Sequence, residues 1–187
     1  FIGMGSLIWY NTHLVNEYFT ADDALDYREG YERKFKKYES LTRLYHTDMR
    51  VEVDLYPKEH RYLVKADYIM INKEEEPITQ LFITEGEPLS EIWIENAQLV
   101  EHDAYYGTYL YAFESPVMPN QKVKMRLKID REFKGYETGQ ELVENGTYIM
   151  HRSFEPVLKY RESLEIPDNF ERAKRGLPHK EVEEASD

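Results

Sequence analysis

The chain has 187 residues, which is enough for one well-buried domain and leaves little room for a second. It contains no cysteine, so disulfide bonds, cysteine metal sites and a thiol nucleophile are excluded. Lysine and arginine number 24 against 36 aspartate and glutamate, and the formal net charge of -12 argues against a nucleic-acid partner.

The chain opens on an apolar segment, residues 1–10, that closes in Trp9-Tyr10. This segment is far shorter than the roughly 20 apolar residues of a membrane helix, and it lacks the basic start of a signal peptide. Two interpretations stay open: the last turns of a membrane helix at the interface, or an ordinary buried N-terminal segment. An exposed apolar N-terminus would also let two copies self-associate.

Residues 20–41 show the period of a helix. Thr20 is a favourable N-cap, and acidic residues come early while basic residues come late, which complements the helix dipole. A stripe recurring every three or four residues predicts that the helix lies along a sheet or another helix. It consists of Ala24, Tyr27, Tyr31, Phe35, Tyr38 and Leu41. The late basic residues indicate either a solvated helix end or a surface for lipid headgroups; they are Arg33, Lys34, Lys36 and Lys37.

Residues 48–72 contain two alternating runs joined by Pro57-Lys58-Glu59, and they predict a long antiparallel hairpin. The apolar residues of the first run are Met49, Val51, Val53 and Leu55. One face of the second run carries Tyr62, Val64, Ala66, Tyr68 and Met70. Because a hairpin with one apolar face is marginal alone, we expect further strands or a second sheet to bury that face.

Further strands are expected at residues 78–84, 89–95, 98–101 and 105–113. Residues 123–129 give the clearest one-sided strand, with apolar residues at odd positions and basic residues between them. The basic face is typical of a solvated strand, although an acidic partner could also bind it. Together these patterns predict a mainly β fold, an antiparallel β-sandwich of about seven or eight strands with an N-terminal α-helix.

Past Gly135 the alternation gives way to glycine, proline and asparagine, which predicts an irregular C-terminal arm. One short helix is expected in the arm at residues 168–175, opened by Pro167 and closed by Gly176. The expected organisation is a membrane-proximal apolar segment and helix in residues 1–45, a β-sandwich domain in residues 46–135 and the arm in residues 136–187.

The sequence carries no recognised catalytic motif. None of the six histidines is followed by glutamate, so the zinc-protease helix H-E-x-x-H is absent, and no nucleophile elbow, phosphate-binding loop or dinucleotide fingerprint is present. We therefore expect no catalytic, metal-binding or cofactor-binding residue and no cofactor. The alternative is a hydrolase whose site is assembled in space, for example from His102 with Asp103 or from His151 with Glu155.

The 16 tyrosines support a second alternative, a module that binds a carbohydrate or a peptide. The candidate platform consists of Trp93, Tyr105, Tyr109 and Tyr111. Adjacent residues of a strand point to opposite faces, so Tyr105 and Tyr106 cannot line the same groove. Clustered, solvent-facing aromatic side chains would favour this alternative, and buried ones would favour a structural role.

Several stretches, taken in order, resemble one family. They are Trp9-Tyr10-Asn11-Thr12 followed by Asn16-Glu17-Tyr18, residues 31–39 (YERKFKKYE), residues 51–57 (VEVDLYP), Asn145-Gly146-Thr147 and residues 171–178 (ERAKRGLP). The family is the large bacterial membrane proteins that join an ABC-2 type transporter permease to an M1-family aminopeptidase-like region. The resemblance spans most of the chain and rests on structural motifs. Residues 150–156 (MHRSFEP) depart from the family's loop.

The resemblance implies a noncatalytic extracytoplasmic segment similar to the N-terminal β-sandwich of M1 aminopeptidases. Such a segment would support or position the peptidase region, whose zinc-binding domain lies downstream and has no matching position here. It would lie on the periplasmic face of the inner membrane, tethered by a flanking transmembrane helix. Its partner would be the remainder of its own membrane-anchored chain.

Overall fold

The computed structural model describes residues 2–10, 20–133, 142–143, 146–147, 149 and 154–181. The helices are α1 (Ile2–Tyr10), α2 (Ala21–Phe35) and α4 (Asn169–Lys174), with single 3-10 turns η2 (Lys36–Tyr38), η3 (Pro57–Glu59) and η4 (Glu162–Leu164). The strands are β1 (Tyr45–Tyr56), β2 (Arg61–Ile71), β3 (Ile78–Thr84), β4 (Glu91–Ile94), β5 (Ala97–Asp103), β6 (Thr108–Val117), β7 (Lys122–Glu132), β8 (Leu142–Val143) and β9 (Gly146–Thr147).

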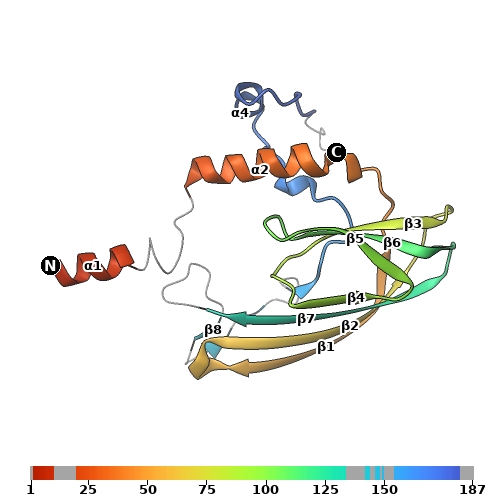
Figure 1. Ribbon diagram of the computed structural model, residues 1–187, viewed down its shortest axis with the longest axis horizontal. Coiled ribbons are helices and arrows are strands. Elements are labelled where there is room, and N and C mark those ends of the chain that lie inside the picture. Colours follow the sequence, from red (N-terminus) through yellow and green to blue (C-terminus); the bar gives the residue numbers. More distant parts are fainter. Residues whose placement is uncertain are drawn as a thin grey trace, which may run out of the picture.

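Two antiparallel sheets pack face to face (Figure 1). The first has the strand order β1-β2-β7-β4, the second has the order β3-β6-β5, and β8 pairs with β9. The mainly β, sandwich-like fold predicted from the sequence is therefore confirmed. The hairpin of β1 and β2 is confirmed as well, with Val51 opposite Ala66 and Val53 opposite Val64.

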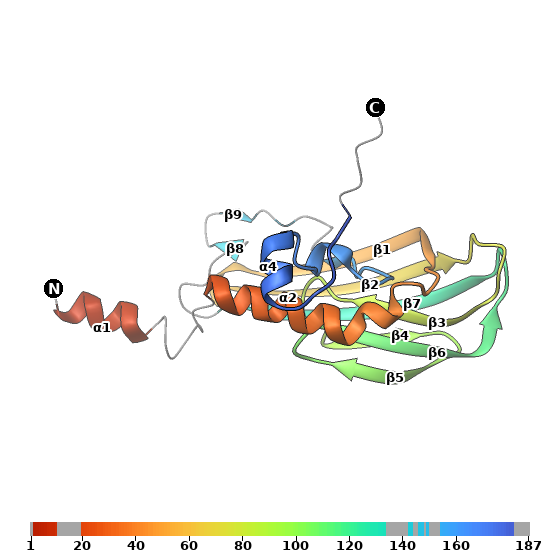
Figure 2. The same ribbon diagram turned by 90° about the horizontal axis from the view of Figure 1, so that it is seen from above.

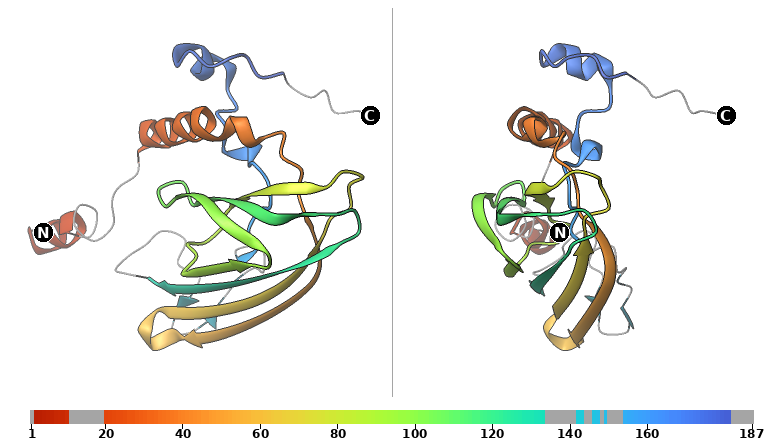
Figure 3. Two further views of the ribbon diagram at one scale, coloured as in Figure 1. Left: turned by 45° about the vertical axis from the view of Figure 1, so that its right-hand side comes forward. Right: turned by 90° about the vertical axis from the view of Figure 1, so that its right-hand side faces the viewer.

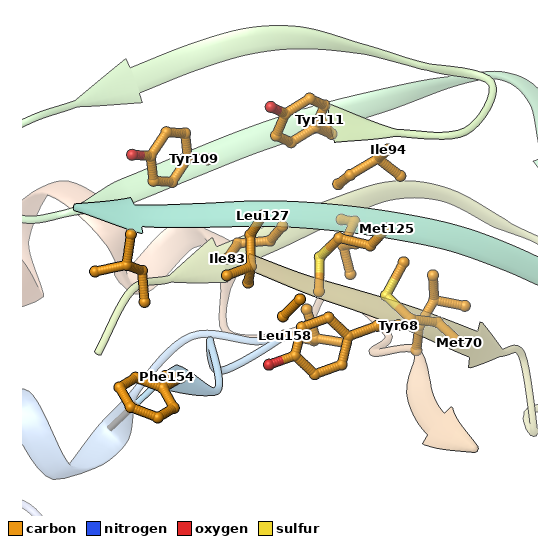
Figure 4. Close-up of a cluster of buried hydrophobic side chains, with 14 of the residues drawn as sticks. Tyr68, Met70, Ile83, Ile94, Tyr109, Tyr111, Met125, Leu127, Phe154 and Leu158 are labelled. Carbon is orange, nitrogen blue, oxygen red and sulfur yellow. The ribbon is translucent and has the colours of Figure 1, made fainter. Parts of the chain in front are cut away.

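The main core lies between the two sheets, where Figure 4 shows a part of it. The apolar face predicted for β2 is fully buried, from Tyr62 at 0% exposure to Met70 at 0%. The predicted one-sided strand β7 pairs with β2 in the same sheet and extends this buried face with Val123, Met125, Leu127 and Ile129. Period-two alternation in these two strands thus identified the buried faces correctly.

The helix α2 covers the outer face of the sheet β3-β6-β5 (Figures 1 and 2). It begins at a capping box in which Thr20 and Asp23 bond to each other's backbone N–H groups. Tyr31 and Phe35 are buried against Phe82 and Leu110, so the predicted stripe does lie along a sheet. The α-helix ends at Phe35, earlier than predicted, because the chain tightens into the turn η2, as is common at helix C-termini.

Strands β4 and β5 are adjacent in the chain but belong to different sheets. Only Glu95 and Asn96 separate them, and Asn96 has the positive φ of 55° that a sharp reversal requires. This short link is therefore where the chain crosses from one layer of the sandwich to the other.

The C-terminal arm packs on the far side of α2 (Figure 2). Its buried Arg172 donates two hydrogen bonds to the Glu32 carboxylate, and its buried Glu165 accepts from Lys36 and Tyr160. Helix α4 is capped by Asp168 at its N-terminus, as the predicted short helix requires. Residues 165–175 of the arm thus lie against α2, whereas residues 154–160 pack on the sandwich itself.

Helix α1 contains the apolar N-terminal segment. Three of its side chains are exposed, Met4 at 75%, Trp9 at 56% and Tyr10 at 54%, which does not fit a buried N-terminal segment. Within the residues that the structure describes, no helix has both the length and the apolar character needed to cross a membrane.

Candidate functional site

Strand β1 carries an exposed apolar face, which we call the β1 overhang and define as Met49, Val51, Val53 and Leu55. Each of these residues lies directly opposite a buried residue of β2, for example Val53 opposite Val64, so both sit on the core side of the sheet. Yet Met49 is 42% exposed, Val53 40% and Leu55 44%, whereas Val51 is half-buried.

The expectation that this face would be buried in the chain's own core is therefore wrong. The second sheet is one strand narrower, and its β3 edge is extended by a single antiparallel bridge between Thr84 and Val157. Phe154 and Leu158 of that segment cover β2. Strand β1 lies beyond them at the free edge of the sheet (Figure 3, right).

A groove of about 850 Å³ lies on the opposite, outer face of the same sheet. Its wall is Trp93 of β4, which is 44% exposed and lies under the Arg126 guanidinium at 4.2 Å from the ring centre. Lys65 and Lys128 face each other across β2 and β7, and Lys128 forms an ion pair with Glu91 at 3.1 Å. The basic outer face predicted for β7 is thus interleaved with carboxylates from the neighbouring strands.

The structure does not bring the four predicted platform residues together. Tyr109 and Tyr111 are 6% and 5% exposed and belong to the core, where Figure 4 shows Tyr111 near Ile94. Tyr105 is exposed in the turn between β5 and β6, where its ring packs on Tyr27 and Tyr106. Trp93 lies on the outer face of the other sheet. Of the four, Trp93 lines the outer groove.

A third surface is a pocket of about 560 Å³ between the start of β1 and the segment 155–161. We call it the cationic pocket, because its lining includes Arg43, Lys73, Lys159 and Arg161. No local sequence pattern indicates this pocket, since these four residues come from three separate segments. The segment alternates strictly between half-buried and buried side chains from Glu155 to Tyr160, which turns Glu155, Val157 and Lys159 to the same side.

The wall of the cationic pocket contains a histidine–glutamate pair that spacing could not reveal. His46 Nδ1 lies 2.6 Å from Glu155 Oε1, and the His46 ring packs on Tyr68 at 4.9 Å between centres. Burial and the nearby Glu155 carboxylate raise the pKa of Tyr68 to about 12. Among the described residues, neither His46 Nε2 nor Tyr68 Oη has a hydrogen-bond partner, and both atoms are buried.

Of the two histidine–carboxylate pairs considered for a hydrolase, His102 with Asp103 does not form. His102 stacks on Tyr109 with the ring centres 4.3 Å apart, whereas Asp103 pairs with Lys34 and accepts from the backbone of Tyr105. His151 lies outside the described residues, and Glu155 is bonded to His46 instead. In the described ranges, no group of three or more histidine, aspartate or glutamate residues is placed to hold a metal ion.

The late basic residues of α2 and η2 are mostly engaged within the chain. Arg33 pairs with Glu29 at 2.8 Å, Lys34 with Asp103, and Lys36 with Glu165 at 2.7 Å. Lys37 lies over the Tyr38 ring. These contacts are typical of a solvated helix end. Because carboxylates already pair with three of the four cations, little positive charge remains to bind a lipid headgroup.

The chain matches no model of a known protein family, and a search of curated proteins finds no match either.

Proposed function

We propose that this chain is a noncatalytic β-sandwich module that supports or positions a neighbouring region of a longer membrane-anchored polypeptide. In this proposal the parent is a fusion of an ABC-2 type permease and an M1-like peptidase region, and the module lies on the extracytoplasmic face of the membrane. The observation that carries the supporting role is the β1 overhang, a core-side face left exposed by the chain's own second sheet.

A partner is more suited to pack its side chains on the overhang than to add a strand to the edge of β1. The alternate residues of β1, Arg50, Glu52 and Asp54, are charged, and charged side chains on an edge strand oppose pairing with another strand. An apolar patch that is left exposed in this way is typical of a protein-interaction surface. We assign the peptidase-like region of the same polypeptide as the occupant, because the resemblance places that region next to the sandwich.

A photoreactive residue at position 53 of the complete membrane-embedded polypeptide tests the docking role. Val53 and Glu52 are neighbours on β1 but point to opposite faces, so a probe at position 52 is a matched control. We expect the probe at 53 to crosslink to the peptidase-like region and the probe at 52 to leave it unlabelled. Equal labelling from both positions, or a coding sequence without that region, contradicts the proposal.

An assay with zinc tests the noncatalytic part of the proposal. We expect the purified chain to bind no stoichiometric zinc and to release nothing from a panel of aminoacyl reporters. Turnover that is lost on His46→Ala or His102→Ala would show that these histidines form a site.

A carbohydrate- or peptide-binding module is the alternative function, and the exposed Trp93 in the outer groove favours it. Aromatic faces beside charged groups suit sugar rings and peptide side chains. In a Trp9→Phe background Trp93 is the sole tryptophan, so a ligand in the groove should change its fluorescence. A panel of soluble oligosaccharides and peptides that leaves this signal unchanged argues against the alternative.

A further inference from the structure

The cationic pocket concentrates positive charge in a protein that is otherwise acidic. Four lysine and arginine side chains line it in a chain whose formal net charge is -12. A cleft lined by charges of one sign focuses the electrostatic potential and attracts ions of the opposite sign. The pocket therefore offers a local positive potential to an anion.

The chain itself neutralises little of this charge. Within the described residues the four cations make a single ion pair, between Lys159 and Glu162 at a long 3.9 Å. This differs from the end of α2 and the following turn η2, where Arg33, Lys34 and Lys36 each have a carboxylate partner.

Two carboxylates at the pocket, Glu155 in its lining and the nearby Glu74, reduce its net positive charge, but within the described residues neither forms an ion pair with one of the four cations. Glu155 is bonded to His46 at 2.6 Å, and Glu74 accepts a hydrogen bond from the Tyr45 hydroxyl at 2.7 Å. Arg43 and Lys73 both lie over the Tyr45 ring, at 4.4 and 5.3 Å from its centre.

The pocket is also held in place by the fold. The backbones of Thr84 and Val157 exchange two hydrogen bonds of 2.9 Å, which fixes the segment that carries Lys159 and Arg161. The Arg161 N–H donates to Tyr31 Oη at 2.9 Å, which ties the same segment to α2. A site whose walls are fixed in this way loses little conformational entropy when a ligand binds.

We propose that the cationic pocket binds a multivalent oxyanion of the phosphate type. The cations come from three separate chain segments, and a tetrahedral phosphate presents oxygens in several directions, whereas a carboxylate offers two in one plane. Arginine is the side chain best suited to pair with phosphate oxygens, and lysine adds charge without a fixed direction. The phosphate is either a free ion or ester or part of a lipid headgroup.

Titration of the whole chain with inorganic phosphate and pyrophosphate, followed by NMR, tests the proposal. We expect shifts of the backbone amides at residues 43–46 and 155–161, with pyrophosphate binding more tightly because it carries more charge. Flotation with phosphatidic acid vesicles, against phosphatidylcholine vesicles, distinguishes the headgroup from the free ion.

Variants that remove one positive charge distinguish anion binding in the pocket from a general effect of the protein's net charge. Arg43 and Lys73 are exposed, so Arg43→Gln and Lys73→Gln should fold normally, and each should weaken binding about tenfold. Lys58→Gln is the matched control, because Lys58 lies in the turn at the opposite end of β1. Binding of phosphate or of phosphatidic acid vesicles that is lost in the pocket variants alone supports the proposal. Binding of neither probe, or equal loss in the Lys58 control, overturns it.

Discussion

Glu32 of α2 and Arg172 of α4 form a bidentate ion pair across 140 residues of chain, with N–O distances of 2.8 and 2.6 Å. The side chains are 4% and 3% exposed, so each charge depends on the other for neutralisation. Arg172 also donates to the carbonyl oxygens of Ile166 and Pro178. The pair therefore holds the α4 part of the C-terminal arm against α2.

Removing one member of this pair should be strongly destabilising. Arg172→Met leaves the Glu32 carboxylate buried without a partner, and we expect a loss of about 3–5 kcal/mol in the free energy of unfolding, measured in urea. Lys174→Met, in an exposed pair with Glu171, should cost less than about 1 kcal/mol. The double variant Glu32→Leu with Arg172→Met should cost much less than the sum of the single changes. Additive effects would contradict the pairing.

The arm should loosen in acid because of Glu165. Burial alone raises the pKa of this carboxyl, but hydrogen bonds from Lys180, Lys36 and Tyr160 outweigh burial and lower the pKa below its usual 4.5. Since the folded pKa is depressed, the stabilisation is complete above pH 4.5 and is lost as the pH falls through the lower folded value. Urea unfolding between pH 3 and 6 should show this loss, and Glu165→Gln should reduce the slope. An unchanged slope in the variant would assign the acid sensitivity to other carboxylates.

Gly30 should be required by its contact with Tyr106. A Cβ atom at position 30 would lie 2.1 Å from Tyr106 Oη, and the Tyr106 ring is held between Tyr27 and Phe35. We therefore expect Gly30→Ala to lower the melting temperature, although alanine stabilises a helix interior by about 1 kcal/mol relative to glycine. In a Tyr106→Phe background the cost should be smaller, because the oxygen in the clash is gone. The same cost in both backgrounds would contradict the contact.

The β1 overhang should contribute little to the stability of the isolated chain. Leu55→Ala should cost less than about 1 kcal/mol, because that side chain is already 44% exposed. Leu127→Ala, in the core at 4% exposure, should cost about 2–5 kcal/mol. Urea unfolding of both variants measures the difference. A similar cost for the two would mean that the overhang is part of the chain's own core.

Much of the secondary structure could be predicted from local pattern. The start of α2 at Thr20, the hairpin of β1 and β2, the strand β3 and the buried face of β7 all follow from capping or from period-two alternation. These features depend on residues within a few positions of one another, so a single sequence contains the information. The length of α2 was less predictable, because a helix end depends on the packing around it.

Alternation along a strand shows which side chains share a face, but it does not show whether another layer covers that face. The same pattern in β1 and β2 therefore gave an exposed face in one and a buried face in the other. Tyr109 and Tyr111 are buried for the same reason, since the second sheet covers them. Only the tertiary structure brought Arg43, Lys73, Lys159 and Arg161 to one pocket and Arg172 to Glu32, because long-range packing decides which distant segments meet.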